Sequence, residues 1–260
     1  MKNTEQIKAH WDEKADSFGQ SQRATHGDTH LRELEVQAIE QTLGDHLKVI
    51  DVGCGNGYST LRFAKTFSNS HFQGVDYSQK MIEVASDSLA DSGLTNLSFS
   101  VMDVLDSSPE FQNRFDVAIT ERCLINLTSH EDQLKALKNL SSLVKSGGKL
   151  ILSEESIQSY RKINGLRLQV GLPELSIQLH NLYLDMDRIL EELPPSLSLL
   201  NVHDFSSSYY LGTRFFKAFL YHERGWDPGE DVAGEFNRIS TLVPPVGDYG
   251  LIKIYEFVKE

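Results

Sequence analysis

The chain has 260 residues, a length that one large domain can fill. Its net charge of -12 comes without a basic stripe for phosphate groups, so we expect no nucleic-acid partner. It holds two cysteines, no apolar run near membrane-spanning length and no apolar signal segment, and we therefore expect a cytoplasmic protein, monomer or homodimer, with no membrane partner.

Residues 1–47 contain two helical patterns, 6–18 and 30–43, joined by a polar run at 19–29. Such a segment can fold over a ligand pocket as a helical cap. The side chains that we place near a ligand are Trp11, Phe18, Arg23 and His26. Core packing is the alternative for Trp11 and Phe18. His26 and His30 have helical spacing, but no zinc signature accompanies them, so we expect no metal site.

The next feature is an apolar strand at 48–52 that ends in an acid and is followed by alternate glycines, Gly53, Gly55 and Gly57. Ser59 is expected to cap the helix that follows. The third glycine comes one residue too early for the dinucleotide fingerprint G-x-G-x-x-G. The carboxylate of Asp51 would also repel a pyrophosphate, whereas it can pair with an ammonium group. A bare glycine turn without a ligand is the alternative.

Two further strands end in acids, 71–76 at Asp76 and 97–102 before Asp103. A helix is expected at 79–89 between them. An acid at the end of the second strand can accept hydrogen bonds from both ribose hydroxyls, as it does in dinucleotide-binding folds. Three acids after consecutive strands form a specific signal, although a single loop carboxylate is usually only solvated.

A fourth strand is expected at 115–120 and a fifth at 149–153. The segment that connects them ends at Gly147 and Gly148, just before the fifth strand. Ser129 and Asp132 form a capping box that opens the intervening helix. Glu154 and Glu155 follow the fifth strand, at the edge where open α/β sheets bind ligands. The alternative for either glutamate is a solvated helix cap.

The chain then departs from a regular strand-helix alternation. We expect a helix at 185–193, a sixth strand at 197–207 and a last strand at 251–258. Insertions at 157–196 and 209–249 carry aromatic and hydrogen-bonding groups that suit a lid over a small molecule. The alternative is that these aromatics form the core of the insertions.

The pattern from 48 to 156 resembles the class I S-adenosylmethionine (SAM)-dependent methyltransferases of the small-molecule type. It lacks the Asn-Pro-Pro-aromatic signature of amino-directed nucleic-acid methyltransferases. The resemblance implies one Rossmann-like α/β domain, with a seven-stranded, mostly parallel sheet in the order 3-2-1-4-5-7-6 and helices on both faces. It also implies SAM as the cofactor. The residues that it places at the cofactor are Asp51, Gly53, Cys54, Gly55, Gly57, Asp76, Tyr77, Met81, Asp103, Val104, Glu121 and Arg122.

We therefore expect methyl transfer to a small acceptor, on an oxygen of a sugar-like or secondary-metabolite compound. The candidates for a general base are His180, His26 and Glu154, with Glu155 as a further alternative. The candidates for acceptor contacts are Trp11, Arg23, Asn126, Tyr183, Tyr209, Tyr210 and Arg214. Two other functions stay open, a catalytically silent SAM-binding or scaffold protein and, against the glycine spacing, a nucleotide-binding oxidoreductase.

Overall fold

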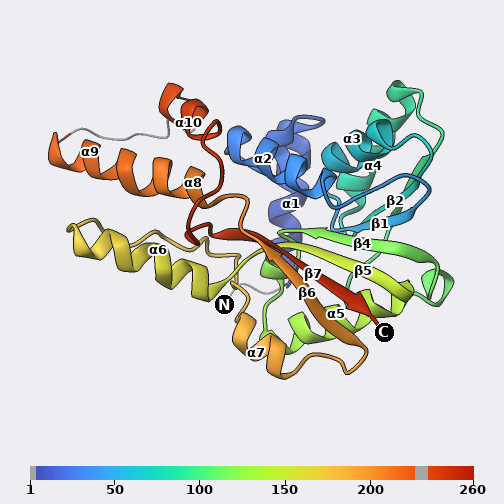
Figure 1. Ribbon diagram of the computed structural model, residues 1–260. Helices are drawn as coiled ribbons and strands as arrows, with labels where there is room; N and C mark the ends of the chain where they lie inside the picture. The colour runs from blue at the N-terminus through green and yellow to red at the C-terminus, as the bar shows by residue number, and fades with distance from the viewer. Residues whose placement is uncertain (1–3, 226–233) are drawn as a thin grey trace.

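The computed structural model describes residues 4–225 and 234–260, and part of the second insertion lies outside them. Seven strands form one sheet in the order β3-β2-β1-β4-β5-β7-β6, which confirms the expected topology (Figure 1). Strands β1 to β5 pair in parallel, and β7 is antiparallel to both of its neighbours. The strands are β1 Lys48–Val52, β2 His71–Asp76, β3 Leu97–Val101, β4 Phe115–Glu121, β5 Val144–Glu155, β6 Leu197–His203 and β7 Ile252–Lys259.

Helices cover both faces of the sheet (Figure 1). The α-helices are α1 Thr4–Phe18, α2 Thr29–Glu40, α3 Tyr58–Thr66, α4 Gln79–Ser92, α5 His130–Leu143, α6 Ile157–Gln169, α7 Met186–Glu191, α8 Ser207–Tyr210, α9 Lys217–Glu223 and α10 Glu235–Ser240. Short helical turns are η1 Gln22–Ala24, η2 Pro109–Phe111, η3 Leu124–Asn126 and the π-helical turn η4 Leu211–Phe216. No helix in the described ranges is long and apolar enough to cross a membrane.

The core has two layers because successive strand residues point to opposite faces of the sheet. One apolar cluster joins the strands to α2 and α3 and includes Val36, Val49, Phe63 and Ile119. The other joins them to α5 and α7 and includes Ile50, Leu137, Leu150 and Ile189. Both faces of the central strands are therefore buried, as expected for apolar runs in a parallel sheet.

Helices α6, α8, η4, α9 and α10 of the two insertions form a helical arm beyond the sheet, whereas α7 of the first insertion packs against the sheet. Helix α6 lies beside the continuous segment of α8, η4 and α9, and α10 packs on that segment (Figure 1). The N-terminal helices α1 and α2 lie on the other side of the strand ends (Figure 1). The carboxyl ends of β1, β2, β4 and β5 thus face a space between the N-terminal cap and the arm.

Local structure differs from the sequence predictions at several places. Helix α3 starts from Gly57, at φ 76°, rather than from Ser59, whose hydroxyl is within 2.7 Å of Arg32 Nη2. Gly147 and Gly148 lie inside β5, which begins at Val144 instead of residue 149, because Val144 pairs with Phe115 before a bulge. The sixth strand ends at His203 and α8 begins at residue 207. Helix α6 was not predicted, because its buried face is partly polar and includes Ser159, Asn164 and Arg167.

Candidate active site

A cavity of about 480 Å³ opens at the carboxyl ends of β1, β2, β4 and β5. Its walls come from these strand ends, from residues 25–32 of the N-terminal cap and from the two insertions. A smaller chamber of about 60 Å³ adjoins it. The two spaces share wall residues, namely Gly53, Tyr77, Cys123 and Asn126.

The glycine turn after β1 runs between two other segments of the wall. Gly53 and Gly55 have φ values of 77° and 54°, in the left-handed region that favours glycine. A Cβ on Gly53 would lie 2.6 Å from the sulfur of Cys123, and a Cβ on Gly55 would lie 2.6 Å from Thr25 Cγ2. Gly57 has another role, because its Cβ would meet the ring of Phe99 and it does not line the cavity.

Asp76 lies at the end of β2 and faces the cavity. Its two carboxylate oxygens accept hydrogen bonds from the backbone N–H groups of Gly55, at 3.0 Å, and Ser78, at 2.8 Å. Burial raises the pKa of Asp76 to about 6 although these two bonds oppose the shift. The backbone therefore fixes the position of this carboxylate at the cavity wall.

Asp51 lies under the glycine turn and is 1% exposed. Its Oδ2 accepts a hydrogen bond of 2.5 Å from the hydroxyl of Thr60. Its Oδ1 is buried and has no hydrogen-bond partner among the described residues. Burial and the nearby carboxylate of Glu121 raise the pKa of Asp51 to about 8. Since buried polar atoms are normally satisfied, the free oxygen points to a donor from outside the chain.

The smaller chamber has mostly apolar walls, formed by Ile7, Met102, Val104, Leu105 and Leu127. Asp103 lies at its edge and accepts a hydrogen bond of 2.9 Å from the N–H of Leu105. The hydroxyl of Tyr77 is buried without a partner among the described residues. An apolar slot with polar atoms at its edge suits a flat heteroaromatic ring.

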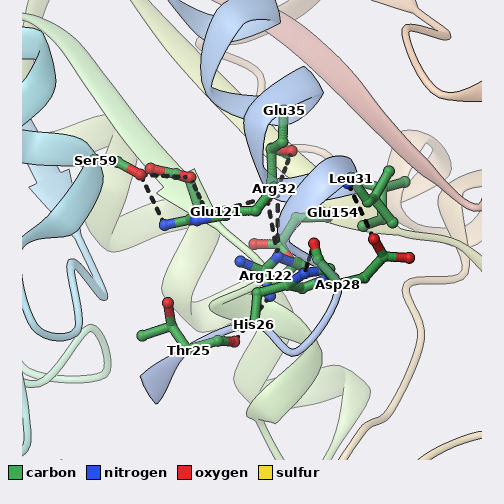
Figure 2. A network of polar contacts seen from close by, with 12 residues as sticks. Thr25, His26, Asp28, Leu31, Arg32, Glu35, Ser59, Glu121, Arg122 and Glu154 are labelled. Atoms are coloured by element: carbon green, nitrogen blue, oxygen red, sulfur yellow. Dashed lines mark hydrogen bonds and ion pairs between the residues drawn. The ribbon is translucent and has the colours of Figure 1, made fainter. Parts of the chain in front are cut away.

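A buried chain of alternating charges crosses the cavity wall beside the glycine turn (Figure 2). Arg32 of α2 pairs with Glu121 at the end of β4 and with Glu35, at 3.0 Å. Arg122 pairs with Glu35 at 3.2 Å and donates to the carbonyl of Thr25 at 3.1 Å. Burial opposes ionisation of Glu35, but Arg122 and Arg32 lower its pKa to about 2. These contacts fix the helical cap to the strand ends.

Arg122 has a φ of 53°, an unusual conformation for a residue with a side chain. It follows β4 directly, and its N–H donates to the carbonyl of Ser153 at 2.7 Å. Strained backbone of this kind persists only where the surroundings hold it, and it is frequent at functional sites.

Glu154 holds the turn after β4 in place. Its carboxylate is 0% exposed and accepts hydrogen bonds from the hydroxyl of Thr120 at 2.9 Å and from the N–H groups of Cys123 and Leu124 at 3.0 Å. It does not line the cavity. The structure therefore gives Glu154 a structural role in place of the predicted catalytic one.

Glu155 does line the cavity, on the side of the insertions. Its carboxylate accepts a weak hydrogen bond from Asn181, at 3.4 Å, and interacts with the hydroxyl of Tyr183. Burial raises the pKa of Glu155 to about 7 although Arg122 opposes the shift. Tyr210, Arg214 and Leu251 continue this wall.

Asp28 joins the helical cap to the arm. It caps α2 by accepting from the N–H of Leu31, and it is 6% exposed. It also accepts from the hydroxyl of Tyr209 at 2.7 Å and pairs with Arg214 at 2.8 Å. Tyr209 is thus part of the buried junction and does not contact the cavity.

Both candidate histidines line the cavity. His26 Nδ1 lies 2.7 Å from the carbonyl of Asp28, and since a carbonyl only accepts, this nitrogen carries the hydrogen. Burial and the neighbouring Arg122 lower the pKa of His26 to about 3. The ring of His180 packs on His10, with centroids 4.6 Å apart, and on Trp11 at 5.7 Å. This stack connects α1 with the loop after α6.

Most of the predicted residues meet at the two adjoining spaces. Those on the walls are Trp11, His26, Gly53, Cys54, Gly55, Asp76, Tyr77, Met81, Asp103, Val104, Glu121, Arg122, Asn126, Glu155, His180, Tyr183, Tyr210 and Arg214. Arg23 is exposed in η1, which turns it away from both spaces, and Asp51 lies beneath the wall. Asp28 and Arg32 were missed. For Asp28, the signal was an acid just before an apolar helical pattern, which is typical of a helix cap.

The sequence is similar to those of several known proteins. A family model described as a methyltransferase domain matches residues 43–191. Over 126 residues the chain is 33% identical to a ubiquinone biosynthesis O-methyltransferase of Coxiella burnetii, covering 47% of this chain and 50% of that protein. Over 112 residues it is 32% identical to malonyl-[acyl-carrier protein] O-methyltransferase 1 of Ilyobacter polytropus, covering 43% of this chain and 39% of that protein. The matches thus span about half or less of these relatives.

Solved structures share the fold. The [4+2]-cyclase SpnF has a TM-score of 0.57 at 22% identity, with 88% of this chain and 80% of that chain covered. A TehB-like SAM-dependent methyltransferase of Corynebacterium glutamicum has a TM-score of 0.53 at 14% identity, with 87% and 88% covered. The family model covers more than half of the chain and the sheet order agrees with these folds. The chain therefore belongs to the methyltransferase-domain family, and family and fold together imply S-adenosylmethionine as its cofactor.

Proposed function

We propose that this protein transfers the methyl group of SAM to an oxygen of a small acceptor bound on the side of the insertions. The observation that carries the proposal is the composition of the cavity wall. One side consists of the strand ends that carry the cofactor motif, and the other consists of Glu155, Tyr183, Tyr210 and Arg214. Two ligands can therefore meet in one enclosed space.

The residues present fit SAM. The carboxylate of Asp76 is held in place to accept from ribose hydroxyls. The free Oδ1 of Asp51 offers an acceptor near the glycine turn, and the apolar chamber beside Asp103 offers a slot for the adenine ring. Gly53 and Gly55 leave no side chain between backbone and ligand. When bound, SAM supplies an electrophilic methyl carbon.

The chain itself would contribute alignment, exclusion of water and one proton transfer. The cap and the arm enclose the cavity, so the acceptor can be held in line for the displacement. Glu155 is the base that we assign. Its carboxylate would take the proton of the acceptor hydroxyl, and the acceptor oxygen would form its bond to the methyl carbon as the bond from that carbon to the sulfur of SAM breaks, which leaves S-adenosylhomocysteine. A pKa near 7 suits a base that works near neutral pH.

Calorimetric titration with SAM, its demethylated product S-adenosylhomocysteine (SAH) and NAD tests the cofactor assignment. We expect SAM and SAH to bind with micromolar dissociation constants and NAD not to bind. Binding of NAD alone would contradict the proposal and favour an oxidoreductase. A second assay follows the methyl group of labelled SAM into a panel of small hydroxyl, carboxylate and amine compounds. Tight SAH binding with label found only in carboxylate or amine products would contradict the assignment of oxygen chemistry.

A further inference from the structure

The positive charges on the cavity wall are all neutralised within the part of the chain that the structure describes. The wall carries three arginines and no lysine in those residues. Arg32 pairs with Glu121 and Glu35, Arg122 pairs with Glu35, and Arg214 pairs with Asp28. An acidic ligand would therefore have to compete with a buried carboxylate for each of these guanidinium groups.

The negative charge on the acceptor side has no such partner. Glu155 forms no ion pair with a described lysine or arginine, and its hydrogen bonds come from the neutral groups of Asn181 and Tyr183. His26 does not reverse this balance, because burial and the neighbouring Arg122 lower its pKa to about 3 and its ring is therefore neutral near pH 7.

We infer that the acceptor is a non-acidic hydroxyl compound, and that the cavity discriminates against carboxylates through the unpaired charge of Glu155. This inference rests on the proposed function and names its substrate class. The geometry favours a body of aromatic or apolar character, because the walls around Glu155 include Leu175, Tyr183, Tyr210 and Leu251. A carboxylate near Glu155 would place two like charges in a space of low dielectric, which is strongly unfavourable.

Two probes of the same shape test this inference. 4-Hydroxybenzamide and 4-hydroxybenzoate share a ring and a hydroxyl and differ in one negative charge. Their dissociation constants are measured by NMR titration of the protein saturated with SAH, at pH 8, where Glu155 is ionised. The 3-hydroxy isomers repeat the comparison with the charge in another position. Glu155→Gln is the test variant, and Glu131→Gln, on the exposed surface of α5, is the matched control.

In the wild type we expect the amide to bind at least about tenfold more tightly than the acid, which corresponds to about 1.4 kcal/mol. Glu155→Gln should reduce this ratio to below threefold, and Glu131→Gln should leave it unchanged. In the wild type at pH 6, where Glu155 is protonated, the ratio should also fall. The measurement at pH 6 uses only the wild-type protein, so it does not depend on whether a variant folds.

Equal or tighter binding of the acid to the wild type at pH 8 would overturn the inference. A ratio that stays the same in folded Glu155→Gln and at pH 6 would overturn the role of Glu155. Both results require that SAH binds. Loss of SAH binding itself would instead contradict the proposed function, so the two failures are distinguishable.

Discussion

At the scale of single residues, burial and hydrogen bonding divide four strand-end carboxylates among different roles. Asp51 has an oxygen without a partner among the described residues, and Asp76 is fixed by two backbone N–H groups. Glu154 accepts hydrogen bonds from the backbone of the turn after β4. Glu155 alone faces the insertions. The sequence indicated that acids would follow these strands. It could not distinguish Glu154 from Glu155, because adjacent strand residues point to opposite faces and only the assembled sheet fixes which one meets the cavity.

Asp76→Ala should weaken binding of both SAM and SAH. A hydrogen bond to an ionised group contributes about 1.5 to 3 kcal/mol, so we expect dissociation constants to rise by roughly tenfold to a hundredfold. Calorimetry measures the change, and circular dichroism checks the fold, because Asp76 also accepts from Gly55 and Ser78. Unchanged affinity in a folded variant would remove Asp76 from the ribose site.

Glu155 should set the pH dependence of turnover. Its pKa is raised to about 7, so the carboxylate form that accepts a proton is lost as the pH falls below that value. We expect kcat to rise between pH 6 and 8 in the wild type. In Glu155→Gln, kcat should fall by at least roughly a hundredfold relative to the wild type and should not depend on pH in this range. An identical pH profile in the variant would exclude Glu155 as the base.

At the scale of elements, the fold was predictable where the chain alternates apolar strands with capped helices. The strands at 48–52 and 71–76 and the helix cap at Ser129 were correct, because each depends on local pattern. The side chain of Asp132 accepts from the hydroxyl of Ser129 rather than completing a capping box. The arm was less predictable. Helix α6 buries polar groups and η4 is a π-helical turn, so neither has a clear apolar period. The ion pairs of Arg32 and Asp28 join segments far apart in sequence, and no local signal reports them.

Asp28 should stabilise the junction between α2 and η4 by more than one contact. Asp28→Ala removes a helix cap, a buried ion pair and the partner of the Tyr209 hydroxyl. We expect the free energy of unfolding to fall by about 2 to 4 kcal/mol. Tyr209→Phe removes two hydrogen bonds, the one donated to Asp28 and the one accepted from Asn237, and should cost about 1 to 2 kcal/mol. Urea denaturation compares the two, and equal effects would show that neither the helix cap nor the ion pair with Arg214 contributes.

At the scale of the whole molecule, the buried carboxylates make stability depend on pH. Asp51, Asp76, Glu154 and Glu155 have raised pKa values in the folded state, from about 6 to about 8. Between their ordinary values and these values the folded state binds more protons, so stability is lost as the pH rises. Glu35, with a pKa of about 2, and His26, with a pKa of about 3, act oppositely, and their contributions are lost as the pH falls below 4.5 and 6.5 respectively. Four carboxylates outweigh these two groups between pH 5 and 8. Without ligand, urea denaturation should show lower stability at pH 8 than at pH 5, and the reverse order would contradict this balance.

In the whole molecule, the two sides of the cavity come from different parts of the chain. In the proposed function the strand ends supply the cofactor side, and their sequence pattern already indicates it. The acceptor side depends on how the insertions fold against the cap, through the stack of Trp11 with His180 and the pair of Asp28 with Arg214. Part of the second insertion, including Trp226 and residues 228–229, lies outside the described residues. In the proposed function, the contacts of the acceptor therefore depend on tertiary structure rather than on a sequence motif.

The most direct test of this division is a calorimetric titration of SAH into three proteins: the wild type, Asp76→Ala, and the double variant Tyr183→Phe/Tyr210→Phe. Both tyrosines line the acceptor side, and phenylalanine retains their ring packing. We predict micromolar affinity in the wild type, a loss of at least about tenfold in Asp76→Ala, and affinity within about threefold of wild type in the double variant. Absent binding to the folded wild type, or an equal loss in both variants, would contradict a cavity with separate cofactor and acceptor sides.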